Sequence, residues 1–344
     1  AMSDPAAAMG HGSVLVAGGA GYIGSHVVLA LAEAGWPVAV IDDLSTGRRA
    51  AVPDGVPLVR GDIADRRLVG DTLRRFDVTA VMHFAGSIVV PDSVRRPLDY
   101  YANNTLASHA LLRACVDAGV RAVVFSSTAA VYGEPDAVPV DEDAPTRPVN
   151  PYGRSKLMTE WMLRDVDAAH GLRHVTLRYF NVAGADPRAR TGLATPGATH
   201  LVKVACEVAL GRRPALQVFG TDYPTPDGTC VRDYIHVTDL AVAHVEALRH
   251  LLAGGPSLTL NCGYGRGFSV REVVAAVERR IGRPLAVEFA PRRPGDATQV
   301  IAATDRIAGQ LGWRPALDDL DTIIAHALAW ERKLALEAGP TGGG

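Results

Sequence analysis

A glycine-rich turn between an apolar strand and a helix near the N-terminus constrains the fold most. Residues 13–17 form an apolar β run, residues 18–24 read Gly-Gly-Ala-Gly-Tyr-Ile-Gly, and helical character follows over 25–34. Many turns are glycine-rich, so the flanking strand and helix carry the prediction. Glycines here let the backbone approach a pyrophosphate, and the helix N-terminus supplies oriented N–H donors. We predict a dinucleotide-binding turn, with Gly18, Gly21 and Gly24 at the cofactor.

An acidic residue follows the second strand at the spacing typical of dinucleotide-binding folds. The predicted strand over 38–41 runs into Asp42, which lies 18 residues after Gly24. A carboxylate at about this spacing accepts hydrogen bonds from the adenosine ribose hydroxyls and repels a 2′-phosphate. The alternative is a solvated acid at a strand end. The sequence therefore predicts NAD, not NADP.

Strands and helices then alternate along the first half of the chain. We expect strands at 58–60, 79–84, 122–126 and 174–179, and helices at 65–76, 98–118 and 151–170. This rhythm predicts an α/β fold with a Rossmann-type, doubly wound parallel sheet. Ligands bind beyond the carboxyl ends of such strands. The residues expected there are Asp62, Ile63, Phe84, Ala85, Gly86, Thr128 and Asn181.

The alternation fails after Asn181. A loop over 182–200 precedes predicted helices at about 200–210, 238–252 and 269–281, strands at 217–219, 231–237, 258–261 and 285–289, and two closing helical pieces. We predict a smaller C-terminal substrate domain interleaved with the first. The NAD-binding domain would take residues 13–181 plus about 233–262, and the substrate domain about 182–232 plus 263–335. Residues 1–12 and 339–344 are expected to be disordered.

Tyr152 and Lys156 are the candidate catalytic pair. Four residues separate them, so within a helix they share one face. An adjacent cation lowers the pKa of a phenol from about 10 by roughly 1–3 units. Tyr152 is therefore predicted to act as a base near neutral pH. An isolated pair of this kind is more often a surface Tyr and Lys on an amphipathic helix, so the context of the pair must decide.

Composition excludes several classes of protein. A formal net charge of −2 gives no bulk basicity for nucleic acid or anionic membrane, and no apolar run reaches the roughly 20 residues of a membrane span. The four cysteines form no CxxC pair, which favours a reduced, cytoplasmic setting. No HExxH pattern occurs, and His170 and His174 flank a glycine, so no metal is expected.

With the glycine turn, Thr128, Tyr152 and Lys156 in this order, the chain resembles the UDP-glucose 4-epimerase (UDP-galactose 4-epimerase) family of extended short-chain dehydrogenases/reductases. Matching segments include GGAGYIGSH, FSSTAAVYG, PYGRSKLM, LRYFN and GTDYPTPDGTCVRDYIHV, and the resemblance covers nearly everything from about residue 14 to 330. It implies tightly bound NAD and interconversion of UDP-glucose and UDP-galactose through a transient 4-keto sugar. It also implies a homodimer formed through the helices at 98–118 and 151–170.

The resemblance also implies residue roles. Thr128 would hydrogen-bond the sugar 4-hydroxyl, Tyr152 would be the base, and Lys156 its electrostatic partner and nicotinamide-ribose ligand. Implied cofactor contacts are Tyr22, Ile23, Asp42, Asp62, Ile63, Phe84, Ala85, Gly86, Asn103 and Phe180. The implied nucleotide-sugar pocket comprises Asn181, His200, Leu201, Gln217, Phe219, Arg232, Tyr234, Arg293 and Asp296. Its arginines suit a diphosphate, although solvated surface charges are the alternative.

Several positions leave the substrate open. Val300 matches a position whose bulk limits the space beside the sugar 2-substituent, and His200 stands where many relatives carry Asn. UDP-GlcNAc, UDP-xylose and UDP-glucuronate therefore remain alternative substrates. Related dehydratases and decarboxylases need a further acid or base after the Thr128 position, where this chain has Ala129 and Ala130. A non-catalytic NAD-binding sensor is the alternative from another class.

Overall fold

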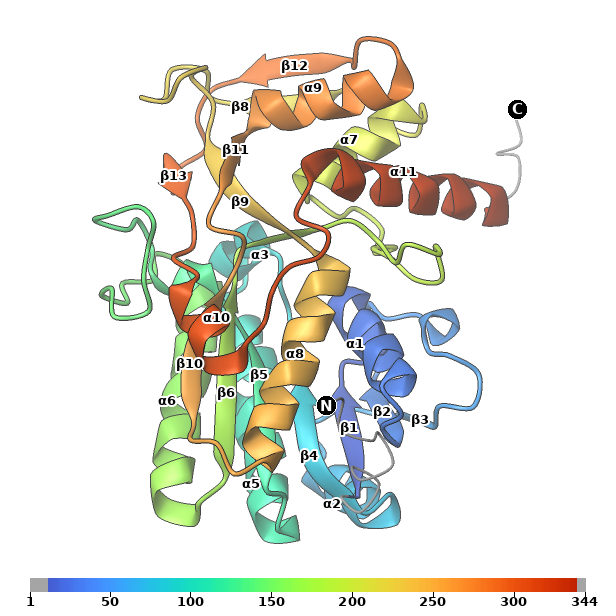
Figure 1. Ribbon diagram of the computed structural model, residues 1–344, viewed down its shortest axis with the longest axis vertical. Helices are drawn as coiled ribbons and strands as arrows, with labels where there is room; N and C mark the ends of the chain where they lie inside the picture. The colour runs from blue at the N-terminus through green and yellow to red at the C-terminus, as the bar shows by residue number, and fades with distance from the viewer. Residues whose placement is uncertain (1–11, 339–344) are drawn as a thin grey trace.

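The computed structural model describes residues 12–338, which form two lobes (Figure 1). The lower lobe contains a seven-stranded sheet in the order β10-β6-β5-β4-β1-β2-β3, with every neighbouring pair parallel. Its strands are β1 (Ser13–Ala17), β2 (Val38–Asp42), β3 (Leu58–Arg60), β4 (Val78–His83), β5 (Ala122–Thr128), β6 (Arg173–Tyr179) and β10 (Leu258–Cys262). The predicted Rossmann-type α/β fold is confirmed. The strand order reverses between β1 and β4, where such sheets bind ligands.

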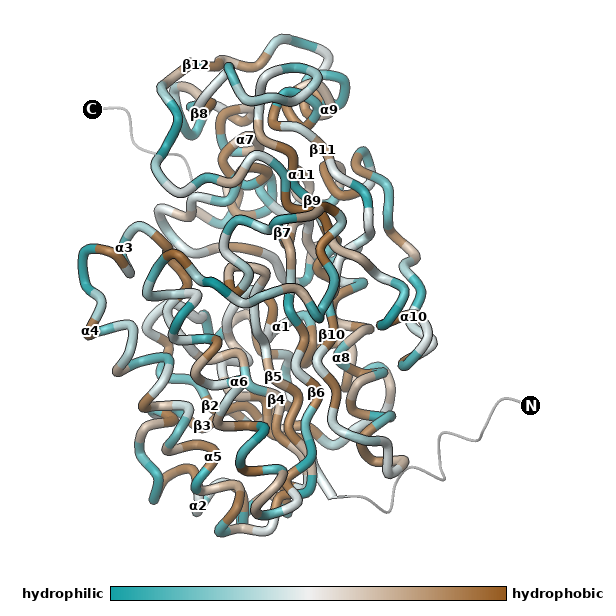
Figure 2. Tube along the Cα trace, turned by 90° about the vertical axis from the view of Figure 1, so that its left-hand side faces the viewer, coloured by the Kyte–Doolittle hydropathy of each residue, from teal (hydrophilic) through white to brown (hydrophobic). Residues whose placement is uncertain are grey.

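Helices cover both faces of this sheet. On one face lie α1 (Tyr22–Glu33) and α8 (Val237–Leu252), and on the other α2 (Arg66–Arg75), α5 (Ala107–Ala118) and α6 (Pro151–His170). Alternate β1 residues supply the two cores: Val14 and Val16 pack towards α1 and α8, whereas Leu15 and Ala17 pack towards α2, α5 and α6. Burial on both faces explains why β1, β2 and β4 are largely apolar, and these strands lie in the hydrophobic centre of Figure 2.

The upper lobe is smaller and is built on α7 (Leu201–Ala209), α9 (Val270–Ile281) and α11 (Leu320–Glu337), which share one apolar core. Strand β8 (Leu216–Phe219) pairs with β12 (Val287–Ala290). Strand β9 (Val231–His236) pairs in parallel with β7 (Asn181–Ala183) and β13 (Gln299–Val300), and antiparallel with β11 (Gly267–Ser269). Between these excursions the chain returns to the lower lobe to form α8, β10 and later α10 (Asp305–Leu311), so the lobes are interleaved. The domain boundaries given above stay predictions.

Several element bounds differ from those predicted. The helix expected over 98–118 is divided into α4 (Pro97–Tyr100), a π-helical segment η3 (Tyr101–Leu106) and α5, and α3 (Val90–Arg95) precedes it. Helix α1 begins at Tyr22, inside the glycine turn, and β5 extends to Thr128 before the short 3₁₀ helix η4 (Ala129–Val131). Another 3₁₀ helix, η2 (Arg49–Ala51), follows β2. The expected loop over 182–200 loses its first residues to β7, because these pair with β9.

Three further expectations can be compared with the structure. All four cysteines are free and buried. Within residues 12–338, no helix combines the length and apolar character needed to span a membrane. Residues 1–11 and 339–344, which fall in the segments expected to be disordered, lie outside the described residues.

Candidate active site

The glycine turn is pressed against the loop that follows β4. Gly18 has φ 82°, and a Cβ there would lie 2.6 Å from the backbone nitrogen of Ala85. A Cβ on Gly24 would overlap the carbonyl oxygen of Gly18. Gly21 caps α1 without a side-chain hydrogen bond, and the first turn of α1 carries no acidic residue. Apart from the Ala20 amide, which donates to Asp42, the turn offers backbone N–H donors that no side chain occupies, and this fits the pyrophosphate of a dinucleotide.

Asp42 ties the end of β2 to this turn. Its Oδ2 accepts a hydrogen bond from the Ala20 amide (2.9 Å) and its Oδ1 accepts one from the Leu44 amide (2.8 Å). The side chain is buried, and burial raises the pKa of its carboxyl despite these two donors. Each carboxylate oxygen can accept a further hydrogen bond. The position and chemistry of Asp42 fit the ribose hydroxyls of NAD.

The buried side chain of Asn104 lies beside the loop after β4. The Phe84 and Ala85 amides donate to the Ala17 carbonyl (2.8 and 3.0 Å). A Cβ on Gly86 would lie 2.8 Å from Oδ1 of Asn104, which is buried. Asn103, the predicted contact, is exposed and donates to the Ser87 hydroxyl (2.8 Å). The sequence analysis missed Asn104, which is the next residue in the chain. The two side chains differ in which side of the helix they face.

The other predicted cofactor residues are distributed around the same end of the sheet. The Tyr22 hydroxyl donates to the Gly184 carbonyl (2.7 Å), which joins α1 to the segment after β7. Oδ1 of Asp62 accepts from the Ala64 amide (2.8 Å) and shapes the turn after β3. Three apolar members pack into cores: Ile23, Ile63 and Phe180.

The start of α6 brings the candidate catalytic residues together. Asn150 caps the helix by accepting from the Gly153 amide (2.8 Å), and Pro151 occupies the first turn. Tyr152 and Lys156 follow, and Thr128 ends β5 opposite them. The Thr128 hydroxyl oxygen accepts from the Ala130 amide (3.1 Å), and the Thr128 side chain also hydrogen-bonds the Tyr152 phenol.

The prediction that Lys156 by itself brings the phenol near neutral is wrong. Burial raises the pKa of Tyr152 to about 12, and the hydrogen bond with Thr128 only partly offsets that increase. The Lys156 ammonium instead donates to the Ser126 carbonyl (3.1 Å) and lies 5.2 Å from the centre of the Phe125 ring. Burial lowers the pKa of Lys156 to about 8. The low-polarity environment therefore disfavours charge on both partners.

Part of the predicted sugar-nucleotide set gathers around β9. Val300 stands opposite Arg232 in the β13–β9 pair, and Tyr234 stands opposite Asn181 in the β9–β7 pair. Arg232 is half-buried and donates to the Val231 carbonyl (2.9 Å). Tyr234 is buried, which raises the pKa of its phenol.

A second part lies in the upper lobe. The Arg293 guanidinium sits 4.4 Å from the centre of the Phe219 ring, and its Nε is 3.0 Å from Oδ2 of Asp296. Gln217 is exposed on the same strand as Phe219. Arg293 retains 49% of its side-chain exposure, so its guanidinium is accessible to a ligand.

His200 precedes α7 and is immediately followed by Leu201, its first residue. Its Nδ1 is buried and has no hydrogen-bond partner in the described part of the chain. Burial, with the nearby charge of Lys203, lowers the pKa of its ring. A neutral imidazole can replace an amide as donor or acceptor.

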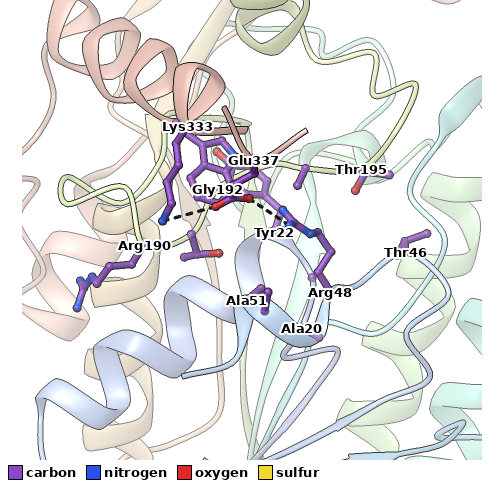
Figure 3. Close-up of a pocket in the computed structure, with 15 residues that line it drawn as sticks. Ala20, Tyr22, Thr46, Arg48, Ala51, Arg190, Gly192, Thr195, Lys333 and Glu337 are labelled. Atoms are coloured by element: carbon purple, nitrogen blue, oxygen red, sulfur yellow. Dashed lines mark hydrogen bonds and ion pairs between the residues drawn. The ribbon is translucent and has the colours of Figure 1, made fainter. Parts of the chain in front are cut away.

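A cavity of about 60 Å³ lies where the glycine turn meets α11 (Figure 3). Gly21 and Tyr22 line it from the turn. Glu337 on α11 pairs with Arg48 (3.5 Å) and with Lys333 of the same helix (4.0 Å). Tyr152 is not among its lining residues. The cavity therefore belongs to the approach to the turn and not to the catalytic pair. No group of three or more metal-ligating side chains occurs within residues 12–338.

The model of the NAD dependent epimerase/dehydratase family matches residues 14–263. The chain is 65% identical over 329 residues to the UDP-glucose 4-epimerase of Azospirillum brasilense, covering 96% of this chain and 94% of that relative. The structure of UDP-glucose 4-epimerase from Brucella ovis in complex with NAD superposes with a TM-score of 0.90 at 46% identity, over 92% of this chain and 98% of that one. The UDP-Glc/GlcNAc 4-epimerase from Campylobacter jejuni gives 0.82 at 44% identity, over 94% and 99%.

Proposed function

Because the chain belongs to the NAD dependent epimerase/dehydratase family, we propose that it interconverts UDP-glucose and UDP-galactose by inverting C4 of the hexose. The observation that carries this function is the position of Tyr152 and Lys156 on one face of α6, next to Thr128 and at the ligand-binding end of the sheet. The substrate named for the Azospirillum brasilense relative supports the choice of sugar nucleotide.

NAD is the cofactor. When bound, it supplies the acceptor and donor of the C4 hydride. The glycine turn and α1 would hold its pyrophosphate, Asp42 its adenosine ribose, and Lys156 its nicotinamide ribose. The turn fits this task because a side chain is sterically excluded at Gly18 and at Gly24, so the backbone stays open to the pyrophosphate.

Tyr152 is the proposed base and acid. Its phenolate would accept the proton of the 4-hydroxyl while C4 is oxidised to the ketone, and would return that proton when C4 is reduced on the opposite face. Thr128 would hold the same oxygen, since its hydroxyl already reaches the phenol. The sequence of steps returns every proton and electron to the sugar, so the product differs only in configuration.

The sugar must turn over between the two steps while the nucleotide stays in place. Arg232 and Arg293 would anchor the diphosphate, because a guanidinium offers paired donors to phosphate oxygens. Arg293 has its guanidinium stacked on Phe219, and its partner Asp296 is adjacent. The remaining proposed pocket residues are Asn181, His200, Leu201, Gln217 and Tyr234.

A related substrate, UDP-GlcNAc, is a second candidate. Val300 is a half-buried valine opposite Arg232, and a side chain of this size leaves more space than a tyrosine would. The Campylobacter jejuni structure is named for activity on both UDP-Glc and UDP-GlcNAc. Val300→Tyr should lower kcat/KM for UDP-GlcNAc more than for UDP-galactose.

The deciding assay measures conversion of UDP-galactose, UDP-GlcNAc, UDP-xylose and UDP-glucuronate by the purified protein with its cofactor. Formation of UDP-glucose from UDP-galactose by the native protein, and not by Tyr152→Phe, is the expected result. A protein that binds NAD but converts none of these sugars would instead be a sensor.

A homodimer and a cytoplasmic location are further proposals. Leu111, Leu112, Leu157 and Leu163 are buried within the subunit. Leu98, Leu106 and Trp161 are 79%, 64% and 47% exposed, on α4, η3 and α6, and η3 packs against α6. A second copy of the chain would cover these side chains. Sedimentation at micromolar concentration should give a dimer, and Leu106→Glu with Trp161→Glu a monomer. The four reduced cysteines support the cytoplasm.

A further inference from the structure

A buried ion pair lies behind the catalytic residues. Glu160, four residues after Lys156 on α6, receives two hydrogen bonds from Arg178 on β6: Nε to Oε1 (3.0 Å) and Nη2 to Oε2 (2.6 Å). The side chains of Arg178 and Glu160 are only 7% and 3% exposed. Oε1 also accepts a hydrogen bond from the Ser127 hydroxyl on β5 (2.6 Å). One carboxylate thus joins a helix to two adjacent strands.

Stability alone does not account for this pair. Removing two charges from water is costly, and a buried ion pair often stabilises a fold no more than apolar residues of the same volume. We propose that Glu160, Arg178 and Ser127 are positioning residues that hold the end of β5 against α6 and so set the placement of Thr128 relative to Tyr152. This role rests on the proposed epimerase function and deepens it.

Ser127, which hydrogen-bonds Glu160, lies between the two β5 residues that contact the catalytic pair. Ser126, before Ser127, accepts the Lys156 ammonium on its carbonyl (3.1 Å). Thr128, after Ser127, hydrogen-bonds the phenol of Tyr152. Neither neighbour can keep its place if Ser127 shifts, because the three are consecutive in one strand. Through its hydrogen bond to Ser127, the ion pair therefore fixes the positions of Ser126 and Thr128.

Arg178 extends the same network away from α6. Its Nη1 donates to the Tyr132 hydroxyl (2.9 Å) and to the Glu142 carbonyl (3.3 Å). The Tyr132 hydroxyl in turn donates to Oδ1 of Asn261 at the end of β10 (2.6 Å). The Glu142 side chain accepts from the Asn261 amide (2.8 Å). The ion pair consequently fixes the segment that follows Thr128 as well as the strand that carries it.

This network reaches the strand that carries the proposed specificity position. Nδ2 of Asn261 donates to the Val140 carbonyl (2.9 Å), and Val140 bridges Ala302 in a parallel β-bridge. The Val140 amide donates to the Ile301 carbonyl (2.8 Å), next to Val300. The proton-transfer residues and the sugar pocket are thereby held in one hydrogen-bonded frame.

Two variants test this role in the protein with bound NAD. Glu160→Leu combined with Arg178→Met removes both charges without leaving one unpaired, and Ser127→Ala keeps the ion pair but cuts its link to β5. Both should retain Tm within a few degrees, bound NAD and KM within about 2-fold, while kcat falls about 10- to 100-fold, the usual effect of a misplacement near 1 Å. Ser127→Thr should restore most of kcat.

The matched control is Lys203→Met combined with Glu331→Leu. This ion pair joins α7 to α11, and its side chains are 6% and 2% exposed, as buried as those of Arg178 and Glu160. Because Lys203 lies near His200 of the proposed sugar-nucleotide pocket, the measurement for this control is the titration of Tyr152, which removal of the pair should leave unchanged. A structural role without positioning would make both double variants behave alike.

The pH dependence supplies a second measurement. Losing the hydrogen bond from Thr128 should move the acid limb of the kcat profile to higher pH, and the absorbance titration of Tyr152, with Tyr152→Phe as blank, should move in the same direction. Native kcat and native titration in Ser127→Ala and in the Glu160/Arg178 variant would overturn the positioning role. A native protein without epimerase activity would refute the proposed function, and the titration would then decide the positioning role separately.

Discussion

Replacing Lys156 with methionine should abolish activity and yet stabilise the fold near neutral pH. The side chain is 4% exposed, and burial lowers the pKa of its ammonium from 10.5 to about 8. Each pKa unit corresponds to about 1.4 kcal/mol, so the buried charge costs about 3 kcal/mol near pH 7. Loss of the hydrogen bond to the Ser126 carbonyl offsets about 1 kcal/mol of this. The expected net gain in the free energy of unfolding is about 2 kcal/mol.

The pH dependence of this gain has a defined sign. Between the folded pKa of about 8 and the ordinary value of 10.5, the unfolded chain binds more protons than the folded protein. The stability of the native protein therefore rises with pH in that interval, relative to the variant, which lacks the titrating group. From about pH 7 to about pH 9.5 the difference between them should shrink by about 2 kcal/mol.

The assay is unfolding of the native protein and Lys156→Met across that pH range, after removal of the cofactor so that ligand binding adds nothing. Lys333→Met, at a side chain 45% exposed, is the control and should show no such pH dependence. A Lys156→Met protein that is less stable than the native one near neutral pH, or a difference that does not change with pH, would refute the reasoning.

Three further substitutions test the site. Tyr152→Phe should lower kcat by at least about 100-fold with bound NAD unchanged, as measured by turnover and by cofactor content, and near-native turnover would exclude Tyr152 as the base. Asp42→Ala leaves two backbone amides without their acceptor, so the free energy of unfolding should fall by about 1–2 kcal/mol, and NAD should be lost faster on dialysis. An unchanged preference for NAD over NADP would contradict the predicted repulsion. Gly24→Ala would force a Cβ against the Gly18 carbonyl, so the purified protein should contain little or no NAD, and a full complement would show that the turn yields more readily than the geometry indicates.

The sequence predicts the main sheet well because the physical cause is local. A strand buried on both faces is mostly apolar, as β1 and the first four residues of β5 are, and parallel strands require the intervening helices. The Tyr152 and Lys156 spacing is similarly local, because a helix fixes which residues share a face. These features need no knowledge of the remainder of the chain.

Features that depend on packing were missed or wrong. The pKa of Tyr152 is governed by burial and by where the Lys156 ammonium finds its acceptor, and neither is visible in a four-residue spacing. In the π-helical segment Asn104 is buried and Asn103 is exposed, a difference that depends on which side of the helix packs against the loop after β4. Glu160 was within reach of the sequence, because it lies one further helical turn beyond Lys156, but its partner on β6 was not.

The two pKa shifts at the site have one cause and a combined consequence. Burial favours a neutral phenol at Tyr152 and a neutral amine at Lys156, so without the cofactor the chain does not stabilise a phenolate–ammonium pair. What it supplies is position: a helix that presents both groups, a threonine that reaches the phenol, and a backbone carbonyl that holds the ammonium. In a site of low polarity an added positive charge acts on the phenol with little screening. In the proposed mechanism, the positive charge of the oxidised nicotinamide would favour the Tyr152 phenolate, so proton abstraction from the sugar would depend on a loaded cofactor site.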